Sequence, residues 1–380
     1  MADGEEGIAE HIAGVGSHMH TDWAVQYIPP LTRCQSDCDS RSETLTAPPT
    51  AADAPAELTI FRRASIFGFM TVDRAVIPVA GLGTRLLPTT KAIPKEMLPA
   101  GRLPIIHHVV EELIAAGIRR ILFVSSRTKI ALENHFDDYS ELMMHLELDG
   151  HEMREVGRFD YRKRGVEFYF TRQQVPLGQT KPLGTGDAVA ASESFVGDAS
   201  FVVAFGDSII RSTESAPLLK RMIDSHAHHG SACTIAACEV PKNLVQHYGI
   251  VIPRHGEADL DDCGLSDIVE KPEPGVTSSR LAVSARYVFS SRIFDEIRGV
   301  QPSRSGEIYL TDAIRQAITR SQQVRAVRLA PAERRYDIGN HLAYFETFID
   351  YAAADSEYGP QIIAYMEQKL EELRRASNAS

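Results

Sequence analysis

One stretch, from Ala75 to Pro99, reads A-V-I-P-V-A-G-L-G-T-R-L-L-P-T-T-K-A-I-P-K-E-M-L-P and governs how the rest of the chain can fold. It opens with an apolar run, Ala75 to Ala80, that is short enough to be a strand buried on both faces. Glycines follow directly, and since glycine has no Cβ, the backbone amides of Gly81, Gly83 and Thr84 can point together at an anionic oxygen. The stretch predicts a phosphate cradle at the carboxyl edge of a parallel sheet.

Cations follow the glycines of this cradle, at Arg85, Lys91 and Lys95. A dinucleotide-binding G-x-G-x-x-G motif would need a third glycine where Leu86 stands. A Walker loop would need Gly-Lys followed by Ser or Thr, where the chain has Thr84 and Arg85. Both loops are excluded, and the remaining alternative is a tight turn with incidental surface cations.

Strands alternate with helices from Met70 onward, which predicts an α/β fold: a Rossmann-like, mainly parallel mixed sheet with helices on both faces. The first crossover helix is predicted between Pro104, which suits a first helical turn, and Gly117, which suits the C′ position. Further buried strands are predicted at 121–124, 166–170 and 201–205.

The two ends of the chain differ from this folded region. Residues 1–69 contain clustered prolines among Ala, Ser and Thr without helical or strand period, which predicts a disordered N-terminal extension. The folded domain is predicted over 70–355 and a C-terminal helix over 356–380. Apolar residues at helical spacing near the C-terminus predict packing against a second subunit, in a homodimer or homotetramer.

Composition limits the partners of the chain. Its 380 residues, 43% of them hydrophobic, can bury a large core, and its formal net charge of −11 argues against nucleic acid or an anionic membrane as a partner. No apolar run approaches a membrane span, the amino terminus is unlike a signal peptide, and the cysteines are odd in number. We therefore expect a cytoplasmic protein with reduced thiols that binds small phosphorylated ligands.

Later segments supply groups for a nucleotide and a metal. Gln173 follows a predicted strand, and its amide offers a donor and an acceptor side by side, the complement of a pyrimidine imide edge. Gly184 and Gly186, in G-T-G-D-A-V, let the backbone approach a flat ring, although a glycine-rich helix entry is the alternative. Asp207 leaves a strand after Gly206 and can hold a hard cation such as Mg²⁺, although such an aspartate is more often a cap or turn residue.

The segment from Ala80 to Pro99 closely resembles the signature of the sugar-phosphate nucleotidyltransferase family. Its form T-K-A-I-P-K-E-M-L-P is most similar to the bacterial uridylyltransferase branch, and the resemblance runs from about Val72 to near residue 355. It implies transfer of a uridylyl group from UTP to glucose 1-phosphate, giving UDP-glucose and pyrophosphate. It also implies Mg²⁺ as the cofactor and in-line attack without a covalent enzyme intermediate.

The resemblance assigns roles to further segments, among them Y-D-I-G-N around Asp337, which is similar to the family segment that supplies a second metal-binding aspartate. The implied residues are catalytic Arg85 and Lys95; nucleotide-binding Ala80, Gly81, Gly83, Thr84, Gln173, Gly184 and Gly186; sugar-phosphate-binding Gly249, Glu270, Lys271 and Arg286; and metal-binding Asp207 and Asp337.

Charge decides how these residues are expected to act. The obstacle to reaction is repulsion between two polyanions, so cations and amides should carry the catalysis. We expect Arg85 at the leaving pyrophosphate, Lys95 at the triphosphate and Lys271 at the sugar phosphate. Three departures from the family pattern stand out: an insertion near Pro176 to Lys181, Asp187 where many uridylyltransferases have histidine, and Ala285 where the family usually has glycine.

Two alternatives stay open beside this interpretation, one within the same class of enzymes and one of a different class. Uracil and thymine differ by one methyl group, worth only about 1–3 kcal/mol in a pocket, so a thymidylyltransferase or another sugar-1-phosphate nucleotidyltransferase is the first alternative. A non-catalytic, nucleotide-sugar-binding regulatory protein is the second. Arg85, Lys95, Asp207 and Asp337 are all present, which argues against a non-catalytic protein. Leu86, in place of the third glycine, argues against a dinucleotide-dependent oxidoreductase.

Overall fold

The computed structural model describes residues 72–137, 139–148, 160–303 and 306–378, and these belong to one compact unit. The extension predicted over residues 1–69 lies outside the described residues.

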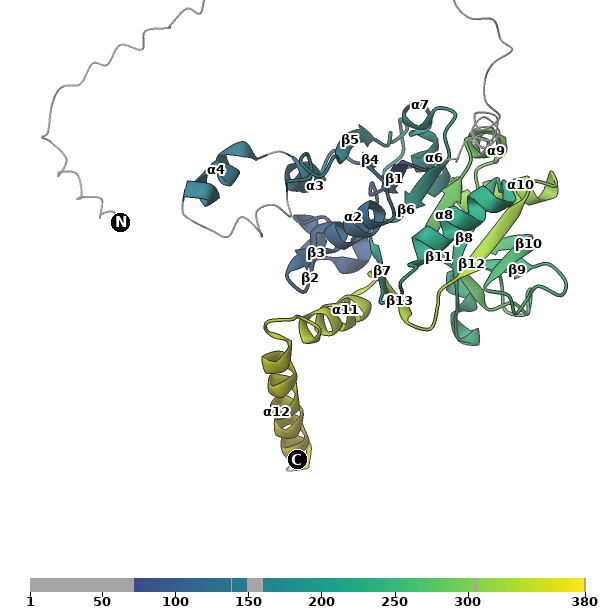
Figure 1. The fold of residues 1–380 in the computed structure, drawn as a ribbon. Helices are drawn as coiled ribbons and strands as arrows, with labels where there is room; N and C mark the ends of the chain where they lie inside the picture. Colours follow the sequence, from purple (N-terminus) through teal and green to yellow (C-terminus); the bar gives the residue numbers. More distant parts are fainter. Residues whose placement is uncertain (1–71, 138, 149–159, 304–305, 379–380) are drawn as a thin grey trace, which may run out of the picture. The chain divides into compact units, whose positions relative to one another are not determined.

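A nine-stranded sheet forms the centre of this unit, in the strand order β5-β4-β1-β6-β11-β8-β12-β10-β9 (Figure 1). The strands are β1 (Arg74–Pro78), β4 (Arg120–Ser125), β5 (Glu167–Arg172), β6 (Phe201–Ala204), β8 (Cys233–Glu239), β9 (Gly249–Pro253), β10 (Asp262–Glu270), β11 (Leu281–Phe289) and β12 (Val324–Arg328).

The direction of the strands divides the sheet into two halves. From β5 to β6 every neighbouring pair is parallel. Beyond β6, β11 runs antiparallel to both of its neighbours, and β10 runs antiparallel to β9 and β12, while β8 and β12 are parallel. The prediction of a mainly parallel sheet is therefore right for the first half and wrong for the second, and the fold is mixed α/β.

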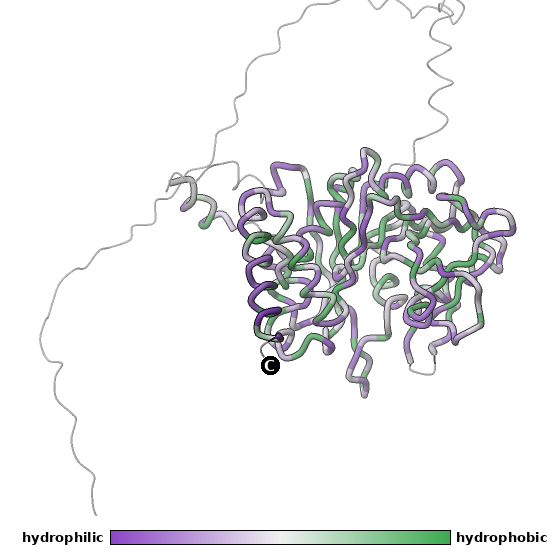
Figure 2. The backbone as a smooth tube through the Cα atoms, turned by 90° about the horizontal axis from the view of Figure 1, so that it is seen from below, coloured by the Kyte–Doolittle hydropathy of each residue, from purple (hydrophilic) through white to green (hydrophobic). Residues whose placement is uncertain are grey.

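Helices cover both faces of the sheet because its strands bury side chains in both directions. In β1, Val76 joins one hydrophobic core while Ala75 and Ile77 join the other, as the two-residue period of a strand requires. Figure 2 shows the hydrophobic segments running through the interior of the unit. One core is covered by α2 (Ile105–Ala115), α3 (Ile130–Phe136) and α8 (Leu218–His229), and the other by α6 (Thr185–Ala190), α9 (Ile293–Gly299) and α10 (Leu310–Thr319).

Smaller elements complete the unit. A two-stranded antiparallel ribbon pairs β7 (Ser208–Ser212) with β13 (Glu333–Asp337), and β2 (Pro99–Ala100) pairs with β3 (Leu103–Pro104). The chain ends in α11 (His341–Ala353) and α12 (Gly359–Asn378). Short helices lie at η1 (Thr84–Leu86), η2 (Thr89–Lys91), η3 (Lys95–Met97), α4 (Ser140–Leu148), α7 (Glu193–Val196) and η4 (Lys242–His247).

Candidate active site

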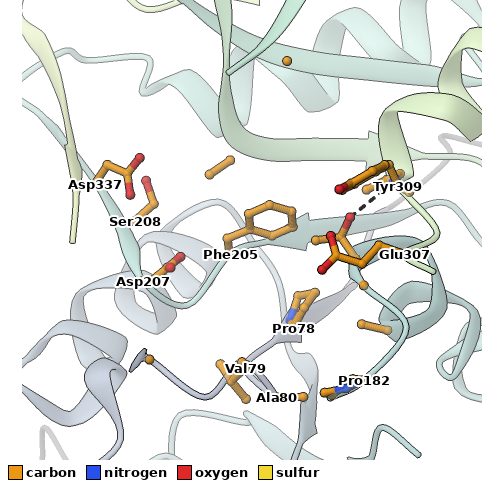
Figure 3. A pocket seen from close by; sticks show the side chains of 18 of the residues that line it. Pro78, Val79, Ala80, Pro182, Phe205, Asp207, Ser208, Glu307, Tyr309 and Asp337 are labelled. Atoms are coloured by element: carbon orange, nitrogen blue, oxygen red, sulfur yellow. Dashed lines mark hydrogen bonds between the residues drawn. The ribbon is translucent and has the colours of Figure 1, made fainter. Parts of the chain in front are cut away.

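A cavity of about 750 Å³ opens at the carboxyl ends of β1 and β6. The segment from Gly81 to Pro99, called the first loop below, was expected to bind phosphate at this place. Figure 3 shows Asp207 and Asp337 at one end of this cavity and Glu307 and Tyr309 at the other. The predicted site residues that line it are Ala80, Gly81, Gly83, Thr84, Arg85, Lys95, Gln173, Gly184, Asp207, Gly249, Glu270, Lys271 and Asp337. Lys91, the third cation of the first loop, is exposed and does not line the cavity.

Asp207 and Asp337 come together because Asp207 immediately precedes β7, and β7 pairs with β13, which ends at Asp337. Asp337 ends β13 opposite Ser208, the first residue of β7, and the Ile338 N–H donates to the Asp207 carbonyl at 3.0 Å. Two carboxylates that are distant in sequence therefore lie beside each other at one end of the cavity (Figure 3). The structure brings these two predicted metal ligands together.

Lys95 pairs directly with Asp207 in this cluster. Burial alone would lower the pKa of Lys95, but the charges of Asp207 and Glu96 outweigh burial and raise that pKa above its usual value. Burial likewise opposes ionisation of Asp207, and the Lys95 charge holds the pKa of that carboxyl below its usual value. Both side chains therefore stay charged around neutral pH.

A second, buried ion pair supports the segment that carries Lys95. Both carboxylate oxygens of Glu96 accept hydrogen bonds from the Lys129 ammonium at 2.8 Å, and both side chains are almost fully buried. Burial raises the pKa of Glu96 in spite of this partner. Lys129 follows β4 and was not singled out from the sequence, because nothing in its neighbourhood there distinguishes it from a surface lysine.

Arginines surround Asp337 in the same way. Arg335 pairs with Asp337, donates to the Val283 carbonyl at 3.0 Å and lies over the Tyr248 ring at 5.0 Å. Arg85 also lies near Asp337: a Cβ placed on Gly339 would be 3.5 Å from both Arg85 Nη1 and Asp337 Oδ1. Arg335 was also missed from the sequence, although a residue two positions before Asp337 on a strand must share its face.

The donor set of this cluster fits one kind of metal. The described residues contain no group of three or more His, Cys, Asp or Glu side chains suited to a metal ion, so a cage made of protein alone is absent there. Mg²⁺, however, is usually bound through one or two carboxylates together with substrate phosphates. Asp207 and Asp337, with cations beside them that attract phosphate, match that mode of binding.

The opposite part of the cavity contains a fixed amide. The Gln173 side-chain NH₂ group donates to the Gly184 carbonyl at 2.8 Å and to Asp187 Oδ2 at 2.7 Å. Gly184 has φ of +100°, and a Cβ there would lie 3.0 Å from the Ile308 carbonyl oxygen, so the position requires glycine. Gln173 is 8% exposed and lines the cavity.

A third group of residues joins a carboxylate to hydroxyl and ammonium partners. Glu270 accepts a hydrogen bond from Thr311 at 3.0 Å and pairs with Lys271 at 3.2 Å. The Lys271 ammonium lies 5.3 Å from the centre of the Tyr309 ring. Ala285 lines the same cavity with φ of +55°, a left-handed conformation that costs a residue with a Cβ.

Two predicted residues lie outside the cavity and require correction. Arg286 follows Ala285 on β11, so its side chain points to the opposite face of the sheet. There it is fully buried, pairs with Glu112 at 2.7 Å and donates to the Ser208 carbonyl at 2.8 Å. It therefore supports the segment that carries Asp207 and does not contact the cavity. Gly186 packs against the chain: a Cβ there would lie 2.7 Å from Ile308 Cγ2.

The chain is similar to a known protein family and to several bacterial enzymes. Residues 74–354 match the model of the nucleotidyl transferase family. The UTP–glucose-1-phosphate uridylyltransferase of Staphylococcus epidermidis is 36% identical over 297 residues, which cover 78% of this chain and 98% of that protein. The enzyme of the same name from Bacillus subtilis is 36% identical over 299 residues, covering 79% and 97%.

A solved structure agrees with the sequence relatives. The UTP-bound UGPase from Acinetobacter baumannii superposes with a TM-score of 0.69 at 32% identity, covering 78% of this chain and 99% of that one.

Among the described residues, no helix has the length and apolar character needed to cross a membrane.

Proposed function

This chain belongs to the nucleotidyl transferase family, and from that membership and its cavity we propose that it transfers a uridylyl group from UTP to glucose 1-phosphate, giving UDP-glucose and pyrophosphate. One observation carries the proposal: two carboxylates and the cations Arg85 and Lys95 meet in a cavity that also holds a fixed amide and the Glu270–Lys271 pair. That cavity offers separate places for a base, a triphosphate and a sugar phosphate.

The proposed chemistry needs no nucleophile from the protein. A phosphate oxygen of glucose 1-phosphate attacks the α-phosphorus of UTP, the bond from that phosphorus to the β-phosphate oxygen breaks, and pyrophosphate leaves in line. Asp207 and Asp337 would hold Mg²⁺, which when bound would offset the negative charge of the triphosphate. The protein's own task is to bring two polyanions together and keep them aligned.

Lys95 is the residue best placed to lower the repulsion between these anions. Its raised pKa keeps it protonated, and it pairs with Asp207 in the cavity that Gly81, Gly83 and Thr84 also line. Arg85, beside Asp337, can take the charge that develops on the leaving pyrophosphate. Neither group has to move a proton for the reaction to proceed.

The sugar phosphate is assigned to the Glu270–Lys271 end of the cavity. Glu270 keeps acceptor capacity beyond its bond from Thr311 and can accept from vicinal hydroxyls of the hexose. Lys271 offsets the charge of the sugar phosphate. Ala285 adds a methyl group to the lining at this end, so it restricts the space for the hexose.

We further propose that the catalytic unit spans residues 70–355 and that α11, at its C-terminal end, and α12, which follows it, take part in self-association. Large apolar side chains are exposed along α11 and α12, among them Leu342, Phe345, Tyr365 and Leu373. Burying them against a second copy would remove apolar surface from water. Light scattering should give the mass of a homodimer or homotetramer, and a monomer at assay concentration would contradict this part.

A matrix of substrates tests the proposed reaction. Four nucleoside triphosphates are combined with the 1-phosphates of glucose, galactose and mannose, and pyrophosphate release is measured with and without Mg²⁺. We expect the highest kcat/KM for UTP with glucose 1-phosphate, and only when Mg²⁺ is present. Release that is faster with dTTP, or that does not depend on the sugar phosphate, would contradict the proposal.

A further inference from the structure

We propose that Asp187 is a positioning residue that fixes the orientation of the Gln173 amide and thereby makes the cavity select a base with a ring N–H. This inference deepens the proposed function and rests on it only in assuming that a nucleotide base lies against Gln173. It assigns a task to a residue that departs from the pattern of similar proteins and that contacts the base only through another side chain.

The orientation of the amide follows from its two partners. Gly184 O and Asp187 Oδ2 are both acceptors and lie 2.8 and 2.7 Å from the same nitrogen of Gln173. An amide NH₂ group has two hydrogens, and these two bonds use both of them. Turning the amide over would place its oxygen against two other oxygens, one of them charged. The nitrogen is therefore held toward the protein.

The carbonyl oxygen is the polar atom of this amide that stays available to a ligand. Both side-chain hydrogen bonds of Gln173 to the described residues are made by its nitrogen and none by Oε1, and the side chain lines the cavity. A free carbonyl oxygen accepts from a donor and repels another acceptor. Uracil presents a ring N–H at its N3 position, whereas cytosine, a base of the same size, presents a bare nitrogen there. The fixed amide should therefore admit uracil and reject cytosine.

Asp187 acts on Gln173 by supplying a second hydrogen-bond acceptor beside the Gly184 carbonyl. The Gly184 carbonyl alone would leave the second amide hydrogen unpaired, and the Gln173 side chain could then rotate to offer its NH₂ group to cytosine. The Asp187 carboxylate supplies the second acceptor and so holds the amide in this orientation, as any acceptor atom at the same place would.

A simpler role for Asp187 has to be separated from this one. It lies in the first turn of α6, where a negative charge interacts favourably with the helix dipole whether or not a base is bound. That role depends on charge alone, so Asp187→Asn and Asp187→Ala should weaken it similarly. The positioning role depends on an acceptor atom, which Asn keeps in its side-chain carbonyl and Ala lacks.

The experiment compares base preference in three forms of the full chain: wild type, Asp187→Ala and Asp187→Asn. Titration calorimetry with UMP and with CMP gives the ratio of their affinities, and circular dichroism checks folding. We expect wild type to prefer UMP, Asp187→Ala to lose about tenfold of that preference, and Asp187→Asn to stay within about twofold of wild type. If Asp187→Ala does not fold, Asp187→Ser, whose hydroxyl is too short to reach Gln173, replaces it.

Two results would overturn the inference: an unchanged UMP-over-CMP ratio in Asp187→Ala, or equal losses in the Ala and Asn variants. Pyrophosphate release from UTP and glucose 1-phosphate by wild type is measured in parallel. If release is absent while the UMP preference and its loss are observed, the proposed reaction is wrong and the positioning role stands. If release is present but the ratio is unaffected in Asp187→Ala, the positioning role is wrong and the reaction stands.

Discussion

Replacement of Lys95 by alanine is the sharpest test of the proposed chemistry, because this ammonium group is held at the carboxylate cluster and is not exchangeable with the other lysine of the first loop. Lys95 is 15% exposed and pairs with Asp207, whereas Lys91 lies four residues earlier, is exposed and does not line the cavity. The two lysines thus lie in the same loop and differ in whether they line the cavity. Lys91→Ala is the matched control.

The magnitude follows from the kind of interaction that is removed. A preorganised group that stabilises charge in the transition state is worth about 10²–10³ in kcat, or about 2.7–4 kcal/mol. We therefore expect Lys95→Ala to lower kcat by at least 10²-fold, with Lys91→Ala within about twofold of wild type. The loss should appear in kcat at saturating substrates, since the charge that Lys95 stabilises is greatest in the transition state.

The assay is pyrophosphate release at saturating UTP, glucose 1-phosphate and Mg²⁺, with circular dichroism to show that both variants are folded. A kcat for folded Lys95→Ala within tenfold of wild type would refute the assignment. Equal losses in the two variants would refute it as well, because the effect would then follow the net charge of the loop and not the position of one ammonium group.

Three further outcomes are expected. Arg286→Met should lower the free energy of unfolding by about 3–5 kcal/mol in urea titrations, because it leaves the partly buried Glu112 carboxylate without its partner. Arg298→Met removes an exposed ion pair and should lower that free energy by less than about 1 kcal/mol. Similar losses in the two variants would contradict the burial argument. Ala285→Gly should stabilise the fold by about 1 kcal/mol in the same titrations, because glycine adopts φ of +55° without strain; a lower urea midpoint would count against it. Removal of Mg²⁺ by EDTA should abolish pyrophosphate release without changing the circular dichroism. Asp207→Asn or Asp337→Asn should raise the Mg²⁺ concentration needed for half-maximal rate. Activity that persists in EDTA would exclude the assigned metal role.

The first half of the sheet could be predicted from sequence because its rules are local. Buried runs bounded by glycine and proline mark parallel strands, and residues that follow such strands meet at one edge. This places the strand predicted from Ala75 to Ala80, which is β1 (Arg74–Pro78) in the structure, in the right relation to Gln173 and Asp207. The direction of the later strands could not be predicted, since it depends on which strand is the partner and not on composition.

The errors in the site have equally specific causes. Arg286 was assigned by its place in a motif, but on β11 it alternates with Ala285 and Tyr287, which line the cavity, so its side chain leaves on the opposite face. Gly186 is required by a tertiary contact with Ile308 that no local pattern announces. Lys129 was missed for the same reason, because its partner Glu96 is distant in sequence.

The ion pairs at the carboxylate cluster explain how one cavity can receive both a cation and a polyanion. Asp207 and Asp337 would repel a triphosphate that arrived alone, and Lys95, Arg85 and Arg335 would repel a metal ion that arrived alone. Pairing the two sets offsets their charges, so each side chain is held in place by an opposite charge. If metal and triphosphate bound together, the carboxylates would hold the metal ion and the lysine and arginines would bind the phosphate oxygens. Each ligand would then supply opposite charges for the groups that the other leaves unpaired, so binding of the two would be mutually favourable.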